Sequence, residues 1–163
     1  QQIDTMSSVA SAFSNFASMP AQQNETLNVV EVVEFSLDIF NEEYIHFESE
    51  DQEVITIMDR TQLIRIITNL VKNAIQAIPE EQEEKNITVA VKKQENNVQI
   101  SVKDNGPGIE PEALEKIFIP FFSTKKTGSG IGLSLSRQIM RQHEGSVTVK
   151  SKIGEGTEFF LRF

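Results

Sequence analysis

The stretch RTQLIRIITNLVKNAIQAI, residues 60–78, decides the fold because its apolar residues recur at helical spacing. The apolar face of this predicted helix is formed by Leu63, Ile66, Ile67, Leu70, Ala74, Ala77 and Ile78. Asp59 can cap the first turn, and Pro79 ends the helix. Asn69 and Asn73 lie four residues apart, so both project from one face beside the apolar stripe.

The two asparagines allow two interpretations. Asparagine is a poor helix former, so a pair in the middle of a helix needs a reason. Amide oxygens are suitable ligands for Mg²⁺, and amide N–H groups can donate to phosphate oxygens. The alternative is an ordinary polar edge of a helix, and the spacing alone leaves both interpretations open.

The remaining segments predict the fold class. Alternating residues predict strands at 44–48, 53–58, 87–93, 97–103, 146–151 and 157–163, with a short strand near Leu27. The first two of these are expected to form a hairpin around Ser49–Gln52. Further helices are predicted at 1–19, 29–41, 111–117 and 131–143. We therefore expect an α/β (α+β) two-layer sandwich, in which about three helices cover a mixed, largely antiparallel sheet of about five strands.

Residues 1–20 are expected to be separate from a domain formed by residues 21–163. A 3-4-3-4 spacing, typical of a coiled coil or helix bundle, relates Ile3, Met6, Ala10, Phe13 and Ala17. One interpretation is a helix packed on its own domain. The other is one helix of a dimeric bundle, which is favoured because a free helix of this length is marginally stable.

Composition excludes several function classes. The 163 residues carry a net charge of −9, whereas nucleic-acid binders usually show a basic patch, so no nucleic-acid partner is expected. The absence of cysteine excludes disulfides and thiolate metal sites. No apolar run approaches the roughly 20 residues of a membrane helix. An acidic chain can still bind a polyanion such as ATP through local cations, a metal ion or backbone N–H groups.

Two glycine-rich segments predict a ligand site. In Asp104-Asn105-Gly106-Pro107-Gly108-Ile109, a strand ends in a carboxylate that can accept a hydrogen bond from an amino group, such as that of adenine. In Gly128-Ser129-Gly130-Ile131-Gly132-Leu133, glycines precede a helix whose N-terminus can bind phosphate. The alternatives are a plain Asn-Gly turn and a flexible lid that ends in a helix cap.

The loop between these segments, residues 118–130, is expected to be a mobile lid. Phe118, Phe121 and Phe122 can anchor it on the domain, and Lys125 and Lys126 are local cations for a terminal phosphate. Solvent-exposed lysines are the alternative.

Five motifs taken in order resemble a known family. They are Asn-Leu-Val-Lys-Asn-Ala (69–74), Asp-Asn-Gly-Pro-Gly-Ile (104–109), Ile-Phe-Ile-Pro-Phe-Phe-Ser-Thr-Lys (117–125), Gly-Ser-Gly-Ile-Gly-Leu (128–133) and Gly-Glu-Gly-Thr (154–157). This order is similar to the N, first glycine, F, second glycine and third glycine boxes of sensor histidine kinases, within the Bergerat-fold ATPase superfamily of gyrase, mismatch-repair and heat-shock chaperone proteins. The similarity covers about residues 27–163.

The resemblance implies roles for individual residues. Asn73 would hold Mg²⁺ and Asn69 would lie near the phosphates of ATP. Asp104 would bond the adenine amine, with Thr157 on the adenine side. The remaining residues implied at the nucleotide site are Gly106, Gly108, Ile109, Phe121, Lys125, Gly128, Gly130, Ile131, Gly132 and Leu133. Many family members carry a basic residue at the position of Gln76, so Lys72 is expected to supply that charge here.

The resemblance also implies partners and a location. Residues 1–19 look like the second helix of a dimerisation and histidine-phosphotransfer hairpin, closest to the nitrogen-regulation type. The acceptor histidine would lie on the absent first helix, because neither His46 nor His143 matches an acceptor context. The expected function is transfer of the ATP γ-phosphate to that histidine, and from there to a response regulator. The full-length protein would be a homodimer, and this segment a cytoplasmic domain of an inner-membrane-anchored protein.

Three other functions share parts of this pattern. An anti-sigma serine/threonine kinase would produce acid-stable phosphate, unlike phosphohistidine. A gyrase- or chaperone-type hydrolase would need a catalytic glutamate where Asn69 stands. A non-catalytic ATP-sensing module would not need every motif intact.

Overall fold

The computed structural model describes residues 21–120, 122 and 132–163, and the predicted helix 1–19 and most of the predicted lid lie outside these residues. The elements in chain order are β1 (Asn24–Asn28), α2 (Val29–Leu37), β2 (Ile45–Ser49), β3 (Ile55–Asp59), α3 (Arg60–Ala77), β4 (Ile87–Lys93), β5 (Val98–Asp104), α4 (Pro111–Leu114), α5 (Gly132–Gln142), β6 (Ser146–Lys152) and β7 (Gly156–Arg162). No helix among the described residues is long and apolar enough to cross a bilayer.

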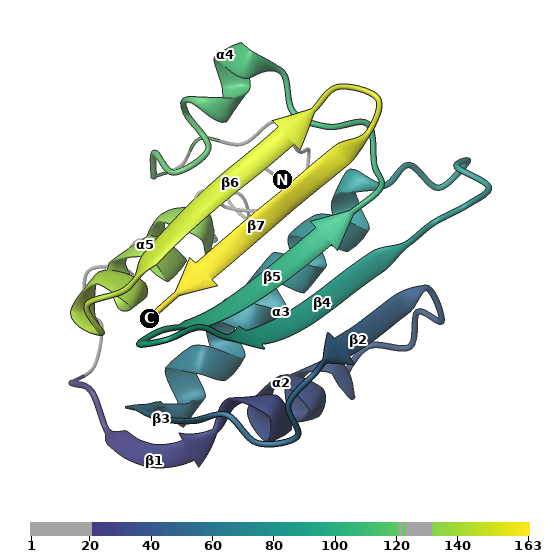
Figure 1. Ribbon diagram of the computed structural model, residues 1–163. Coiled ribbons are helices and arrows are strands. Elements are labelled where there is room, and N and C mark those ends of the chain that lie inside the picture. The colour runs from purple at the N-terminus through teal and green to yellow at the C-terminus, as the bar shows by residue number, and fades with distance from the viewer. Residues whose placement is uncertain (1–20, 121, 123–131) are drawn as a thin grey trace, which may run out of the picture.

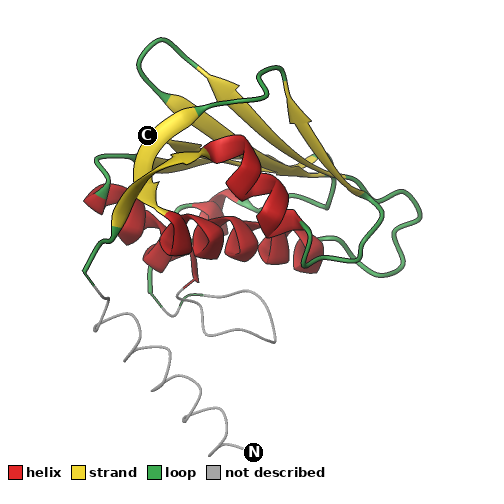
Figure 2. Ribbon diagram, turned by 90° about the horizontal axis from the view of Figure 1, so that it is seen from below, coloured by secondary structure: helices red, strands yellow, loops and turns green. Residues whose placement is uncertain are grey.

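Within the described residues, the fold has one layer of sheet and one layer of helices (Figures 1 and 2). The main sheet has the order β2-β4-β5-β7-β6. Only β2 runs parallel to its neighbour β4, and the other neighbours are antiparallel. Helices α2, α3 and α5 lie on one face of this sheet, which confirms the predicted α/β sandwich (Figure 2).

The predicted hairpin between residues 44–48 and 53–58 is wrong. Strand β3 pairs with β1 in a separate two-stranded sheet, while β2 joins the main sheet beside β4. The reason is the side chain of Asn28, whose Oδ1 accepts hydrogen bonds from the N–H groups of Val30 and Val54. This residue caps α2 and ties the start of β3 to the end of β1, which alternation within each strand could not reveal.

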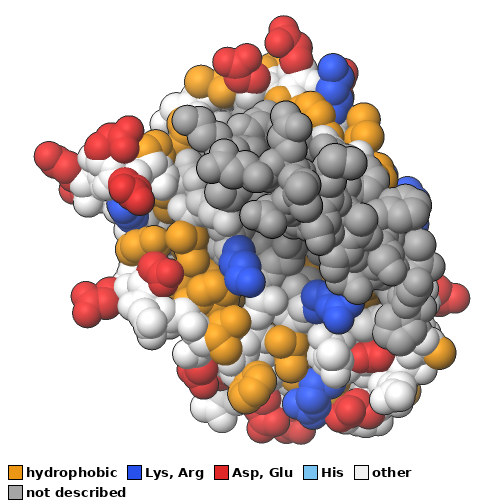
Figure 3. Space-filling model, turned by 180° about the vertical axis from the view of Figure 1, so that it is seen from behind, with side chains coloured by type: hydrophobic (Ala, Val, Ile, Leu, Met, Phe, Trp, Pro, Cys, Tyr) orange, Lys and Arg blue, Asp and Glu red, His pale blue; other side chains and the backbone are white. Residues whose placement is uncertain are grey.

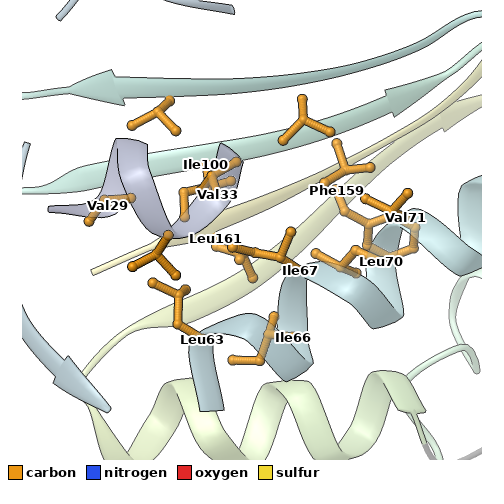
Figure 4. Close-up of a cluster of buried hydrophobic side chains, with 14 of the residues drawn as sticks. Val29, Val33, Leu63, Ile66, Ile67, Leu70, Val71, Ile100, Phe159 and Leu161 are labelled. Atoms are coloured by element: carbon orange, nitrogen blue, oxygen red, sulfur yellow. The ribbon is translucent and has the colours of Figure 1, made fainter. Parts of the chain in front are cut away.

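Helix α3 forms the centre of the core, as its apolar stripe predicts. Five of its aliphatic side chains, namely Leu63, Ile66, Ile67, Leu70 and Val71, have no exposed surface. They belong to one core cluster with Val29 and Val33 of α2 and with Ile100, Phe159 and Leu161 on the inner face of the sheet (Figure 4). Each such burial contributes about 1.5–3 kcal/mol, so this contact fixes the helix on the sheet.

Asp59 fixes where α3 begins. Its Oδ1 accepts from the N–H of Gln62 at 3.1 Å, which confirms the predicted cap. Its Oδ2 accepts from the N–H of Gln23 at 2.8 Å, so the same buried carboxylate holds the segment that enters β1.

Helix α4 is shorter than the predicted helix at 111–117. After Leu114 the chain continues in turns, with Lys116 N–H donating to the Ala113 carbonyl at 2.8 Å. These turns bring Ile117 to the core, and Phe118 packs against it. Burial of these apolar side chains therefore determines the path of this segment. Helical periodicity alone predicts that the helix continues to residue 117.

Candidate functional site

The site begins with a row of three polar residues at one end of the sheet's inner face. Asp104 of β5 lies opposite Thr157 of β7, which lies opposite Ser151 of β6. Asp104 and Thr157 are each only 4% exposed. The residues before Asp104 on this face, Ile100 and Val102, are buried and apolar. The inner face of the sheet thus changes from apolar to polar where β5 ends.

Asp104 is held by the turn that follows it. Its Oδ1 accepts the N–H of Gly106 at 2.9 Å. The next side chain, Asn105, instead bonds the backbone of the 82–86 segment, through Asn86 N–H at 2.8 Å and the Glu84 carbonyl at 3.0 Å. The two adjacent side chains therefore have different roles. Asp104 supplies a buried hydrogen-bond acceptor, and Asn105 binds the neighbouring 82–86 loop to the turn that follows β5.

Gly106 and Gly108 allow the turn to approach its neighbours closely. A Cβ at Gly106 would lie 3.0 Å from the carbonyl oxygen of Ala77 at the end of α3. Gly108 has φ +85°, and a Cβ there would clash with the backbone of Lys152. The N–H of Gly154 also donates to the Pro107 carbonyl at 2.8 Å. The turn is therefore enclosed between α3 and the β6–β7 hairpin.

Asn69 marks the other end of the site. Its Nδ2 donates to Ser136 Oγ at 3.3 Å, and a Cβ at Gly132 would clash with its carboxamide. The first described turn of α5 therefore lies against Asn69. Because the N-terminus of a helix offers unpaired N–H groups and partial positive charge, this is where an anionic group could bind.

Asn73 lies between these two ends. It is half-buried and one turn from both Asn69 and Ala77 on α3. Eight residues separate Asn69 from Ala77, which is about 12 Å along the helix axis. A ligand that contacts both ends must therefore be extended, with an amino group near Asp104 and negative charge near Asn69.

The other predicted site residues divide into two groups. Ile109 and Leu133 are half-buried and pack against the core, and Lys72 is exposed on α3. Phe118 and Phe122 also pack against the core, as predicted for anchors of the lid. Phe121, Lys125, Gly128, Gly130 and Ile131 lie outside the described residues.

Charge on the helix-covered face is unevenly distributed. Some Lys and Arg side chains lie near the middle of the visible face and others at its rim, where most Asp and Glu side chains lie (Figure 3). This acidic chain therefore presents cations on the side of the molecule that carries α3 and α5.

Sequence reasoning missed Ser151. Its Oγ accepts from the Ile109 N–H at 2.8 Å and lies 2.8 Å from Thr157 Oγ1. One signal could have indicated it. On β6 the inward positions Val147 and Val149 are followed by a serine, and the Gly154–Gly156 turn sets that serine opposite Thr157.

Comparison with known proteins places this arrangement in a family. Residues 58–163 match the model described as histidine kinase-, DNA gyrase B- and HSP90-like ATPase. The chain belongs to this family of ATPases. Among its members, the chain is homologous to the catalytic domains of sensor histidine kinases, as the following proteins show.

Sporulation kinase C of Bacillus subtilis is 37% identical over 101 residues, which cover 62% of this chain and 23% of that protein. Sensor histidine kinase ZraS of Salmonella typhimurium is 32% identical over 146 residues, which cover 84% of this chain and 30% of that protein. The chain thus spans less than a third of either relative.

Two solved structures of a histidine kinase support the same relationship. The catalytic domain of histidine kinase ThkA superposes with a TM-score of 0.77 at 30% identity, covering 86% of this chain and 95% of that one. ThkA in complex with the response regulator TrrA matches with a TM-score of 0.82 at 25% identity, covering 99% of this chain and 48% of that one.

Proposed function

We propose that this chain binds ATP with Mg²⁺ and transfers the γ-phosphate to a histidine on a dimerisation domain. The observation that carries this proposal is the separation of two kinds of binding group along α3. The turn after the buried carboxylate of Asp104 lies against the C-terminal end of α3, and the first described turn of α5 lies against Asn69, in the middle of α3.

The adenine end would be formed by the turn after β5. Asp104 would accept a hydrogen bond from the exocyclic amine, and Thr157 would lie on the same side of the base. Gly106, Gly108 and Ile109 would form the floor. The two glycines fit this role, because side chains there would press on the backbone of α3 and of the β6–β7 hairpin.

The phosphate end would be formed by α3 and α5. Asn69 and the first turn of α5, with Gly132 and Leu133, would contact phosphate oxygens, and Lys72 would add positive charge. We extend this part of the site to Phe121, Lys125, Gly128, Gly130 and Ile131 on the strength of the family resemblance.

The donor set also fits Mg²⁺. Within the described part of the chain, no three His, Cys, Asp or Glu side chains gather as metal ligands. Mg²⁺ takes oxygen ligands, and at nucleotide sites it keeps several waters and is held by substrate phosphates with few protein ligands. The Asn73 carboxamide oxygen would be such a ligand. When bound, Mg²⁺ would neutralise charge that develops on the phosphates.

In this reaction, the role of the chain would be to position the triphosphate. A histidine nitrogen would form a bond to the γ-phosphorus as the bond to the β–γ bridging oxygen breaks, and ADP would leave. The chain's own groups would hold the triphosphate in line and exclude water. His46 is exposed on β2 and His143 follows α5, so we assign the acceptor to another domain.

The larger protein is also proposed by analogy. Residues 1–20 would belong to the dimerisation and phosphotransfer domain of a homodimer, and residues 21–163 would form the catalytic domain. The solved complex of ThkA with TrrA supports a response regulator as the final acceptor. Anchoring at the inner membrane, with this domain in the cytoplasm, and the nitrogen-regulation type remain predictions.

A transfer assay tests the reaction. The chain would be incubated with γ-labelled ATP and Mg²⁺, with and without a separate dimerisation hairpin that carries an acceptor histidine. We expect acid-labile phosphate on the hairpin and none on the chain alone. Acid-stable phosphate would contradict the proposal in favour of a serine kinase, and acid-labile phosphate on the chain alone would contradict the external acceptor.

A further inference from the structure

Ser151 has an unusual concentration of hydrogen bonds for one hydroxyl. Its Oγ accepts from the Ile109 N–H at 2.8 Å, donates to the Gly156 carbonyl at 3.1 Å and lies 2.8 Å from Thr157 Oγ1. These contacts join three segments, namely the turn after β5, strand β6 and the start of β7. The hydroxyl therefore lies where the parts of the adenine end meet.

The number of protons decides the direction of these bonds. A hydroxyl has one proton and two lone pairs, and a carbonyl can only accept. The bond between Ser151 and the Gly156 carbonyl therefore forms only when Ser151 directs its proton to Gly156. The bond between Ser151 and Thr157 can then form at the same time only if Thr157 is the donor.

The direction of that bond determines what Thr157 offers a ligand. When the Thr157 proton is directed to Ser151, the outward side of its oxygen carries lone pairs only. The residue opposite it on β5 is Asp104, whose carboxylate is also an acceptor. Two adjacent acceptors suit a group with two N–H donors, and they disfavour an oxo group, which can only accept.

We propose that Ser151 is a positioning residue that fixes the Thr157 hydroxyl as a hydrogen-bond acceptor and thereby favours a 6-amino purine over a 6-oxo purine. This inference rests on the proposed function, because it assumes that the base lies against Asp104 and Thr157. Through Ile109, the same hydroxyl also holds the turn that carries Gly106 and Gly108.

The test compares the affinities of ADP and IDP, which differ in the amino or oxo group at position 6. Ser151→Ala frees the Thr157 proton to donate to an oxo group. We expect the preference for ADP over IDP to fall by about tenfold, which corresponds to one hydrogen bond of about 1.4 kcal/mol. Ser151→Thr retains a hydroxyl and should keep most of the preference. The control is Ser101→Ala, which removes a hydroxyl from the opposite face of the sheet.

A double-mutant cycle separates positioning from general loosening of the site. In Thr157→Val there is no hydroxyl to orient, so adding Ser151→Ala should leave the preference unchanged. If Ser151→Ala weakens ADP and IDP equally, or still changes their ratio in Thr157→Val, the inference is overturned. If the unaltered chain binds neither nucleotide, the proposed function itself fails, which is a distinguishable result.

Discussion

The carboxamide of Asn69 on α3 occupies the space into which a side chain at position 132 of α5 would project. The contact joins the middle of the core helix to the first described turn of α5. The contact also explains why position 132 is a glycine, because any Cβ there would displace the Asn69 side chain. No special backbone conformation is needed for this explanation.

We therefore expect Gly132→Ala to affect ligand binding more than stability. Alanine favours the helix by up to about 1 kcal/mol, and the displaced group is the end of a side chain that can move. The free energy of unfolding should change by less than about 1 kcal/mol, while ATP affinity falls by about tenfold or more. Denaturant melts and calorimetry measure the two effects.

A double variant provides the control. In an Asn69→Ala background, Gly132→Ala should weaken ATP binding no further, because the group it displaces is gone. Additive losses would show that the glycine acts through something other than Asn69.

Gly108 and Gly154 form a matched pair for testing the enclosed turn. Their φ angles are +85° and +83°, but a Cβ at Gly108 would clash with the Lys152 backbone, whereas no described atom lies within 4 Å of one at Gly154. Gly154→Ala should cost about 1–2 kcal/mol from backbone conformation alone. Gly108→Ala should cost at least about 3 kcal/mol, because overpacking against backbone is added. Equal losses in thermal or denaturant unfolding would argue against the close approach.

His143 should make stability depend on pH. Burial lowers the pKa of this histidine below its ordinary value of 6.5, and nearby Asp59 opposes the shift in pKa without cancelling it. The folded protein thus binds this proton less readily than the unfolded chain does. The contribution of His143 to the free energy of unfolding is therefore fully present above pH 6.5. It is lost as the pH falls from 6.5 toward the folded-state pKa, because the unfolded chain then binds the proton first.

Substitution of His143 tests this expectation. His143→Asn should flatten the pH dependence of the unfolding free energy just below pH 6.5. A pH profile of His143→Asn that matches the unaltered chain would contradict the assignment.

The core can be tested with a pair of isoleucines. Ile67 is fully buried on α3, while Ile57 is 68% exposed on β3. Ile67→Ala should destabilise the fold by about 2–5 kcal/mol through lost burial and a residual cavity. Ile57→Ala should change stability by about 0.5 kcal/mol or less. Similar effects in the two variants would contradict the assignment of α3 as the core helix.

The sequence was sufficient to predict elements whose partners are adjacent or whose periodicity is strong. Helix α3, its Asp59 cap and the strands β4, β5, β6 and β7 were all predicted, because local spacing specifies each of them. The pairing of β3 with β1 could not be predicted, since it depends on the Asn28 side chain and Val54, which are 26 residues apart.

The candidate site shows the same division. Asp104, Gly106 and Gly108 occur in one short motif, so the sequence indicated them directly. Ser151 is 42 residues from Ile109, to which it is hydrogen-bonded, and only the strand register brings them together. The proposed direction of the Thr157 hydroxyl depends on the contact between Ser151 and the Gly156 carbonyl.

The central claim is a nucleotide site with Asp104 at the base and Asn73 at the metal. The most direct measurement is a calorimetric titration with ATP and Mg²⁺ of the unaltered chain, Asp104→Asn and Asn73→Ala. We predict micromolar-range binding, on the order of −8 kcal/mol, that Asp104→Asn abolishes and that Asn73→Ala makes independent of Mg²⁺. Failure of the unaltered chain to bind ATP, or full binding by Asp104→Asn, would contradict the account.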